Sequence, residues 1–125
     1  MSVGCGYVAL GGLALCDPHH VKRLVRSRLG ILRPLGLSIQ ELLKLAPMVG
    51  LTVRLAQGWA FQRGKRPTLA DFARRAAPGR YVVCSERHWV SFFKGQDGSV
   101  CYFDSGGRSV RMRITWAVPV TRTTP

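Results

Sequence analysis

Acidic side chains are scarce in this sequence. It has 6 Asp and Glu residues against 19 Lys and Arg residues, which leaves a formal net charge of +13 at pH 7. A folded surface with this balance carries a positive potential and attracts polyanions. Two accounts of the charge stay open: it keeps a small domain soluble, or it serves contact with nucleic acid or an anionic membrane.

Closely spaced cysteine pairs and long apolar runs are also missing. The four cysteines, Cys5, Cys16, Cys84 and Cys101, form no C-x-x-C motif and stand among apolar residues, unlike the disulfide framework of a short secreted chain. The apolar, glycine-rich stretch 3–16 is too short to span a bilayer and lacks a basic leader. We therefore expect a soluble protein of a reducing compartment, the cytoplasm, without a transmembrane segment.

The chain is expected to form one domain. Its 125 residues with 46% hydrophobic content can build one core, and no internal repeat or low-complexity run is present. Four helices are predicted: a buried one at 5–15, one from Asp17, one from Ser38, and one capped by Thr68 with Asp71 that runs through Ala77. A short strand is predicted at 51–55.

From Arg80 onward the apolar pattern has a period of two, which is typical of strands. Strands are predicted at about 80–84, 88–93, 99–104 and 108–114, and the tail from Thr121 is expected to be frayed. Helices followed by an antiparallel meander define an α+β fold, with the sheet packed on the first helix. We expect a single domain over residues 1–125, with a helical part at about 1–78 and a sheet part at about 79–120.

Cys5 has the position of a nucleophile. A cysteine at the start of a helix has its thiolate stabilised by the helix dipole and by unpaired main-chain N–H groups. The flanking Gly4 and Gly6 let the backbone approach a substrate carbonyl, and the Cys5 N–H is a candidate oxyanion donor. An ordinary buried cysteine fits the same position, so the interpretation depends on a partner.

His88 and Asp104 are the candidate partners. If they lie directly opposite each other on paired strands, the hairpin is centred on Gln96, inside a glycine-rich turn. Opposed side chains have Cβ atoms about 5 Å apart, within reach of a His–carboxylate hydrogen bond. Each residue alone has a plainer interpretation, a locally bonded histidine and a turn-forming aspartate. Together with Cys5 they supply the thiol, the imidazole and the orienting group of a cysteine hydrolase.

The sequence resembles papain-like cysteine peptidases, in particular the small members that viruses and phages encode. The resemblance rests on four short motifs, in family order, that span most of the chain: Gly4-Cys5-Gly6-Tyr7, Gly79-Arg80-Tyr81-Val82-Val83, His88-Trp89-Val90 and Tyr102-Phe103-Asp104-Ser105. It implies a helical subdomain headed by the nucleophile, a sheet subdomain carrying His and Asp, and a substrate cleft between them.

The resemblance also implies an activity. The chain would be a thiol hydrolase acting on a polypeptide substrate, at peptide or isopeptide bonds, as in viral polyprotein processing or the removal of ubiquitin-like tags. Cys5 would be the nucleophile, His88 the base and Asp104 the orienting group, with no metal and no organic cofactor. A viral member would work in the host cytoplasm.

One family feature is missing from the sequence. Members carry a glutamine a few residues before the nucleophile, which completes the oxyanion hole, whereas Met1, Ser2, Val3 and Gly4 precede Cys5. The second oxyanion donor is therefore unassigned, with Ser2 as a weak substitute. A papain-like scaffold without turnover is accordingly a further interpretation.

A zinc site is a competing interpretation. Cys16, His19, His20 and Cys84 are suitable ligand types, but their spacing matches no known zinc motif. Cys16 and Cys101 are more simply read as core residues.

A basic nucleic-acid-binding module is the main rival to the hydrolase. A loop places cations beside aromatic residues, the kind of surface on which single strands stack: Trp59, Phe61, Arg63, Lys65 and Arg66. A second basic row follows on the last predicted strand: Arg108, Arg111 and Arg113, of which Arg108 falls on the opposite face. No recognised nucleic-acid motif is present, so this interpretation rests on electrostatics.

Overall fold

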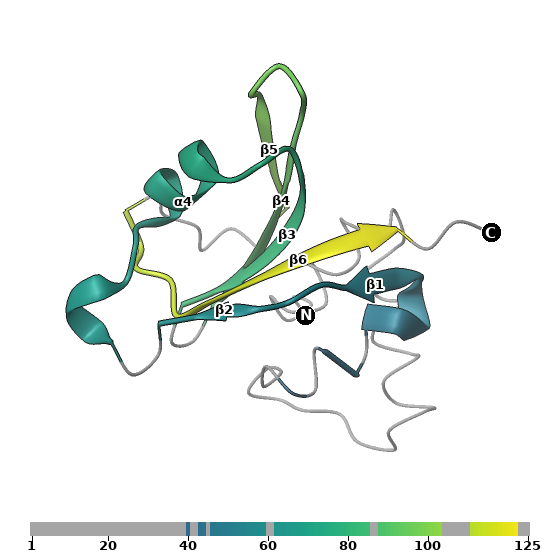
Figure 1. The fold of residues 1–125 in the computed structure, drawn as a ribbon, viewed down its shortest axis with the longest axis horizontal. Coiled ribbons are helices and arrows are strands. Elements are labelled where there is room, and N and C mark those ends of the chain that lie inside the picture. Colours follow the sequence, from purple (N-terminus) through teal and green to yellow (C-terminus); the bar gives the residue numbers. More distant parts are fainter. Residues whose placement is uncertain are drawn as a thin grey trace, which may run out of the picture.

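A computed structural model describes residues 40, 43–44, 46–59, 62–85, 88–103 and 111–122 (Figure 1). Within these residues an antiparallel sheet carries helix α4 (Leu69–Arg75) on one face, in agreement with the expected α+β class. The predicted helices at 5–15 and from Asp17 lie outside the described residues. Gln40, Leu43 and Lys44 are helical, as the third predicted helix requires, and the 3-10 turn η1 (Ala46–Val49) follows them.

The sheet has the spatial order β1-β6-β3-β4-β5, and β2 also pairs with β6. The strands are β1 (Leu51–Val53), β2 (Gln57–Gly58), β3 (Gly79–Cys84), β4 (Trp89–Lys94), β5 (Val100–Phe103) and β6 (Trp116–Arg122). Strands are present where 51–55, 80–84, 88–93 and 99–104 were predicted, and the described bounds differ from the predicted ones by one or two residues. β3, β4 and β5 form the expected meander.

The last predicted strand, 108–114, is wrong in its described part. Residues 111–114 form no strand, and Arg113 makes an isolated bridge to Thr68. The final strand is β6, which runs past Thr121 and lies between β1 and β3 instead of extending the meander beyond β5. β6 contains Pro119, and a proline inside an apolar run weakens the sequence signal for a strand.

The register of the β4–β5 hairpin differs from the prediction. A hairpin centred on Gln96 would pair Ser91 with Cys101, whereas Ser91 pairs with Phe103. The predicted register is therefore wrong by two residues. Because the side-chain period of a strand is two, a shift of two residues leaves the described residues of β4 and β5 on their predicted faces.

The turn of this hairpin explains the register. Asp97 Oδ1 accepts hydrogen bonds from the Ser99 main-chain N–H (3.0 Å) and hydroxyl (2.7 Å). Gly98 has a φ of +87°, a left-handed conformation that glycine adopts without steric cost. A three-residue loop with a glycine bulge centres the hairpin on Asp97, one position beyond the prediction.

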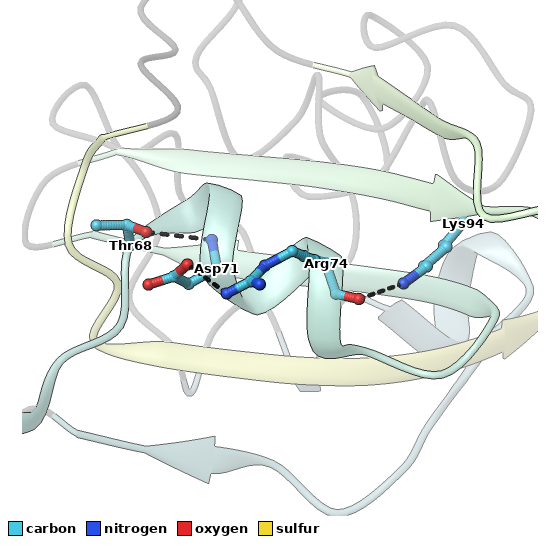
Figure 2. A network of polar contacts seen from close by, with 4 residues as sticks. All are labelled: Thr68, Asp71, Arg74 and Lys94. Carbon is cyan, nitrogen blue, oxygen red and sulfur yellow. Dashed lines mark hydrogen bonds and ion pairs between the residues drawn. The ribbon is translucent and has the colours of Figure 1, made fainter.

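Helix α4 begins where the sequence predicts. Thr68 Oγ1 accepts a hydrogen bond of 3.1 Å from the Asp71 main-chain N–H, which confirms the predicted cap (Figure 2). Apolar residues at helical spacing turn one side of α4 toward the sheet, where Leu69 and Ala73 are buried. The core that they complete contains Leu69, Ala73, Tyr81, Val83, Val90, Phe92, Ile114 and Ala117.

The opposite face of the sheet is also apolar. Val82, Trp89, Val118 and Val120 alternate with the residues that meet α4, and all four are buried. Among the described residues, no helix is both long enough and apolar enough to cross a membrane.

Candidate functional site

His88 stands directly before β4. Its main-chain carbonyl accepts a hydrogen bond of 2.9 Å from the Ser85 N–H, which closes the connection from β3. The residue is half-buried, and its Nε2 atom is buried without a hydrogen-bond partner in the part of the chain that the structure describes. A buried polar atom without a partner costs roughly 1–3 kcal/mol, so a native fold keeps few of them.

The other members of the predicted triad lie outside the described residues. These are Cys5, with its flanking Gly4 and Gly6, and Asp104. Within the described part, Phe103, the residue before Asp104, pairs with Ser91 on the strand that His88 precedes. The structure thus describes the histidine and the hairpin on which the predicted pair depends.

The candidate zinc ligands Cys16, His19 and His20 also lie outside the described residues. Cys84, the fourth, ends β3, and its thiol donates a hydrogen bond of 2.7 Å to the carbonyl of the next residue, Ser85. No group of three or more His, Cys, Asp or Glu side chains within the described ranges is arranged to hold a metal ion.

A second site is a cleft of about 770 Å³ beside α4. Its walls come from α4, from the 3-10 turn η2 (Arg63–Lys65), from the segment containing β2, and from β3 and β6. Its lining includes cationic and aromatic side chains that the sequence separates widely: Trp59, Lys65, Arg66, Phe72, Arg75, Tyr81 and Arg113. We call this feature the basic cleft.

The basic cleft joins two features that the sequence shows separately. Lys65 and Arg66 come from the predicted basic loop, and Arg113 comes from the predicted basic row. Arg75, on α4, was not among the predicted site residues. Asp71, which also lines the cleft, lies four residues before Arg75, so both residues are on one side of the helix. This spacing is the sequence signal that indicates Arg75.

Main-chain contacts fix two of the cleft's arginines. Arg66 Nε donates a hydrogen bond of 3.2 Å to the carbonyl of Trp59, and Arg113 Nη1 donates one of 3.0 Å to the carbonyl of Arg66. The segment after η2 therefore lies against both Trp59 and the chain that leads into β6. Four cations line the cleft with one carboxylate, Asp71, which forms a 3.0 Å ion pair with Arg74.

Aromatic rings form the wall between the cleft and the core. Phe72 packs edge-to-face against Trp59, with centroids 6.1 Å apart, and against Tyr81, with centroids 5.5 Å apart. The Tyr81 hydroxyl donates a hydrogen bond of 2.7 Å to the Ala77 carbonyl, and burial raises the pKa of Tyr81 above its usual value. Tyr81 is thus a neutral hydrogen-bonded group at physiological pH.

The two sites share one end of the sheet. The Trp59 N–H donates to the Thr115 carbonyl (2.7 Å), and the Thr115 N–H donates to the Cys84 carbonyl (2.6 Å). The N–H of Ser85, the residue after β3, donates to the carbonyl of His88. A row of main-chain hydrogen bonds therefore links the Trp59 end of the basic cleft to His88.

No protein-family model, curated protein sequence or solved structure matches this chain.

Proposed function

We propose that the protein is a thiol hydrolase that cleaves peptide or isopeptide bonds, with Cys5 as nucleophile, His88 as base and Asp104 as the group that orients the imidazole. The observation that carries the proposal is the buried Nε2 of His88, which has no partner among the described residues. A catalytic imidazole needs one nitrogen for the nucleophile's proton and the other for an orienting group. A histidine with only a structural role is expected to use its buried nitrogen in a hydrogen bond.

The strand arrangement supports the pairing with Asp104. Antiparallel pairing brings Phe103 opposite Ser91, three residues after His88. Continued by one residue, this register would place Asp104 opposite Val90, diagonal to His88 and on the same face of the sheet. Diagonal neighbours lie about 7–8 Å apart, within reach of a ring side chain. The papain-like arrangement, a helical part headed by Cys5 packed on this sheet, belongs to the same proposal.

The proposed reaction needs no cofactor. His88 takes the proton of the Cys5 thiol, and the thiolate attacks the substrate carbonyl carbon to form a tetrahedral intermediate whose oxyanion accepts a hydrogen bond from the Cys5 N–H. Collapse breaks the C–N bond, the leaving amine takes the proton from His88, and a thioester remains. A water molecule, deprotonated by His88, then hydrolyses the thioester and restores the thiol.

The proposal is tested by labelling the full chain with a peptide-based electrophile and mapping the modified residue by mass spectrometry. Wild type is expected to label at Cys5, and Cys5→Ala to lose that label. His88→Ala should slow labelling by roughly 100-fold or more, the usual contribution of a positioned base, and Asp104→Asn should slow it less. Equal rates for wild type and His88→Ala would overturn the proposal.

Cys101→Ala is the matched control. Cys101 is an exposed thiol on β5, so any unspecific reaction of the electrophile would occur there as well. The labelling of Cys5 should be unchanged in this variant. Urea denaturation of each variant separates lost reactivity from lost folding.

A further inference from the structure

The basic cleft gathers cations from three separate segments of the chain. Lys65 and Arg66 come from η2 and the residue after it, Arg75 from α4, and Arg113 from the chain before β6. Lys65, Arg75 and Arg113 are exposed. A concave surface with low-dielectric walls focuses the field of such charges toward an anion that enters it.

The cleft's single carboxylate does not offset these charges. Asp71 Oδ1 is 3.0 Å from Arg74 Nη2 (Figure 2). Arg74 is not among the residues that line the cleft. The formal charge of Asp71 is therefore balanced by a cation outside the cleft.

The arginines offer phosphate-binding geometry. Arg113 uses Nη1 to hold the Arg66 carbonyl, and a guanidinium has further N–H donors in the same plane. Planar, bidentate donors match the oxygens of a phosphate, and a main-chain anchor reduces the entropy lost when the ligand binds.

Apolar groups share the lining with these cations. The lining includes the half-buried rings of Trp59 and Phe72, the buried ring of Tyr81, and Leu55, which is 91% exposed. Phosphate contacts alone attract any polyanion, whereas aromatic groups beside the cations suit unpaired bases. We propose that the basic cleft binds a short stretch of single-stranded nucleic acid, with Lys65, Arg75 and Arg113 on its phosphates and Trp59 against a base.

The remaining surface favours this ligand over an acidic peptide. Exposed cations also lie outside the cleft, among them Arg54, Arg74 and Arg122, so a polyanion that continues past the cleft gains further attraction. The cleft's volume of about 770 Å³ admits a few nucleotides of a strand that continues past it. The binding is independent of the proposed hydrolysis, because it uses neither Cys5 nor His88.

The test is fluorescence anisotropy with a labelled single-stranded DNA of mixed sequence, titrated with the full chain at several salt concentrations. The double variant Lys65→Glu/Arg75→Glu is compared with Arg54→Glu/Arg122→Glu, which changes the net charge equally at exposed residues outside the cleft. The cleft variant should bind at least about tenfold more weakly and lose about 1.4 from the slope of log K against log salt, since each lost phosphate contact contributes about 0.7.

Three further arms make the result decisive. Cys5→Ala should bind the strand as wild type does, which keeps this proposal separate from the hydrolase. Polyglutamate of equal charge should compete poorly, and a duplex of the same sequence should bind more weakly than the single strand. An equal loss in the Arg54→Glu/Arg122→Glu control, or equally strong competition by polyglutamate, would overturn the proposed site.

Discussion

Lys94 Nζ donates a hydrogen bond of 2.8 Å to the main-chain carbonyl of Arg74 (Figure 2), and a second, of 2.9 Å, to the carbonyl of Ala73. Lys94 ends β4, and the two carbonyls belong to the last turn of α4, whose carbonyls lack partners within the helix. The contact holds α4, which forms one wall of the basic cleft, against β4. The contact therefore helps to fix the position of α4 beside the basic cleft.

Replacing Lys94 by methionine should destabilise the fold by about 1–2 kcal/mol. The change removes two charge-assisted hydrogen bonds and a cation at the negative end of the helix dipole, while most of the side-chain volume is kept. Urea denaturation followed by circular dichroism measures the free energy of unfolding. Lys44→Met, at an exposed lysine, is the control and should stay within about 0.5 kcal/mol of wild type. Equal effects of the two substitutions would contradict the role of Lys94.

Gly58→Ala should destabilise the protein by about 1–3 kcal/mol, because the new methyl group would overlap the indole ring of Trp116. Trp116 belongs to β6 and is the direct partner of Gly58, which belongs to the neighbouring strand β2. Gly64→Ala is the matched control, since a Cβ at Gly64 meets no atom within 4 Å. Thermal unfolding of the two variants gives the comparison, and a Gly58→Ala protein as stable as the Gly64→Ala protein would show that the ring can move away at no cost.

Thr68→Ala should cost about 1 kcal/mol, because the Asp71 N–H loses the oxygen that accepts its hydrogen bond at the start of α4. Thr68→Ser keeps that oxygen and should recover most of the loss. The free energy of unfolding in urea distinguishes the two variants. If serine were as harmful as alanine, the methyl group of Thr68 and not its hydroxyl would be the stabilising part.

The hydrogen bonds of the Asp97 carboxylate make the stability of the fold depend on pH. The Ser99 hydroxyl and then its main-chain N–H donate to the carboxylate, and these bonds lower the pKa of Asp97 below its usual value of 3.8. The ionised carboxylate therefore stabilises the folded state above the unfolded pKa, and this contribution is lost as the pH falls through the lowered folded value. Asp97→Asn should show a smaller loss of stability on acidification from about pH 5 to pH 2. Urea midpoints measured across that range check the expectation, and parallel profiles for the two proteins would refute it.

Local signals in the sequence predict much of the sheet. The strands β3, β4 and β5 are found because turn residues bound their short apolar runs, at Pro78-Gly79 and at Lys94-Gly95-Gln96-Asp97-Gly98. The cap at Thr68 is predicted as well, since a hydroxyl three residues before an acidic residue is a local feature. The hairpin register is missed by two residues because the bulge at Gly98 depends on a backbone conformation that spacing alone does not reveal.

Long-range assembly is what the sequence does not predict. β6 pairs with strands that lie far before it in the chain. Its short apolar run is as typical of a segment of a buried helix as of a strand. The basic cleft is missed for a similar reason. Trp59, Arg75 and Arg113 share no periodic pattern and meet only because α4 and β6 fold onto the same part of the sheet. The sequence predicts His88 as a site residue, but the burial of its Nε2 atom is a property of the fold.

The pH dependence of Cys5 alkylation tests the central claim most directly. The rate of reaction with iodoacetamide, followed at Cys5 by mass spectrometry from about pH 4 to pH 10, reports the fraction of thiolate, which for an ordinary cysteine rises around pH 8.5. The proposed pair predicts that in wild type this rise occurs well below pH 8.5 and that His88→Ala moves it back toward that value. A wild-type profile that coincides with the His88→Ala profile would contradict the claim.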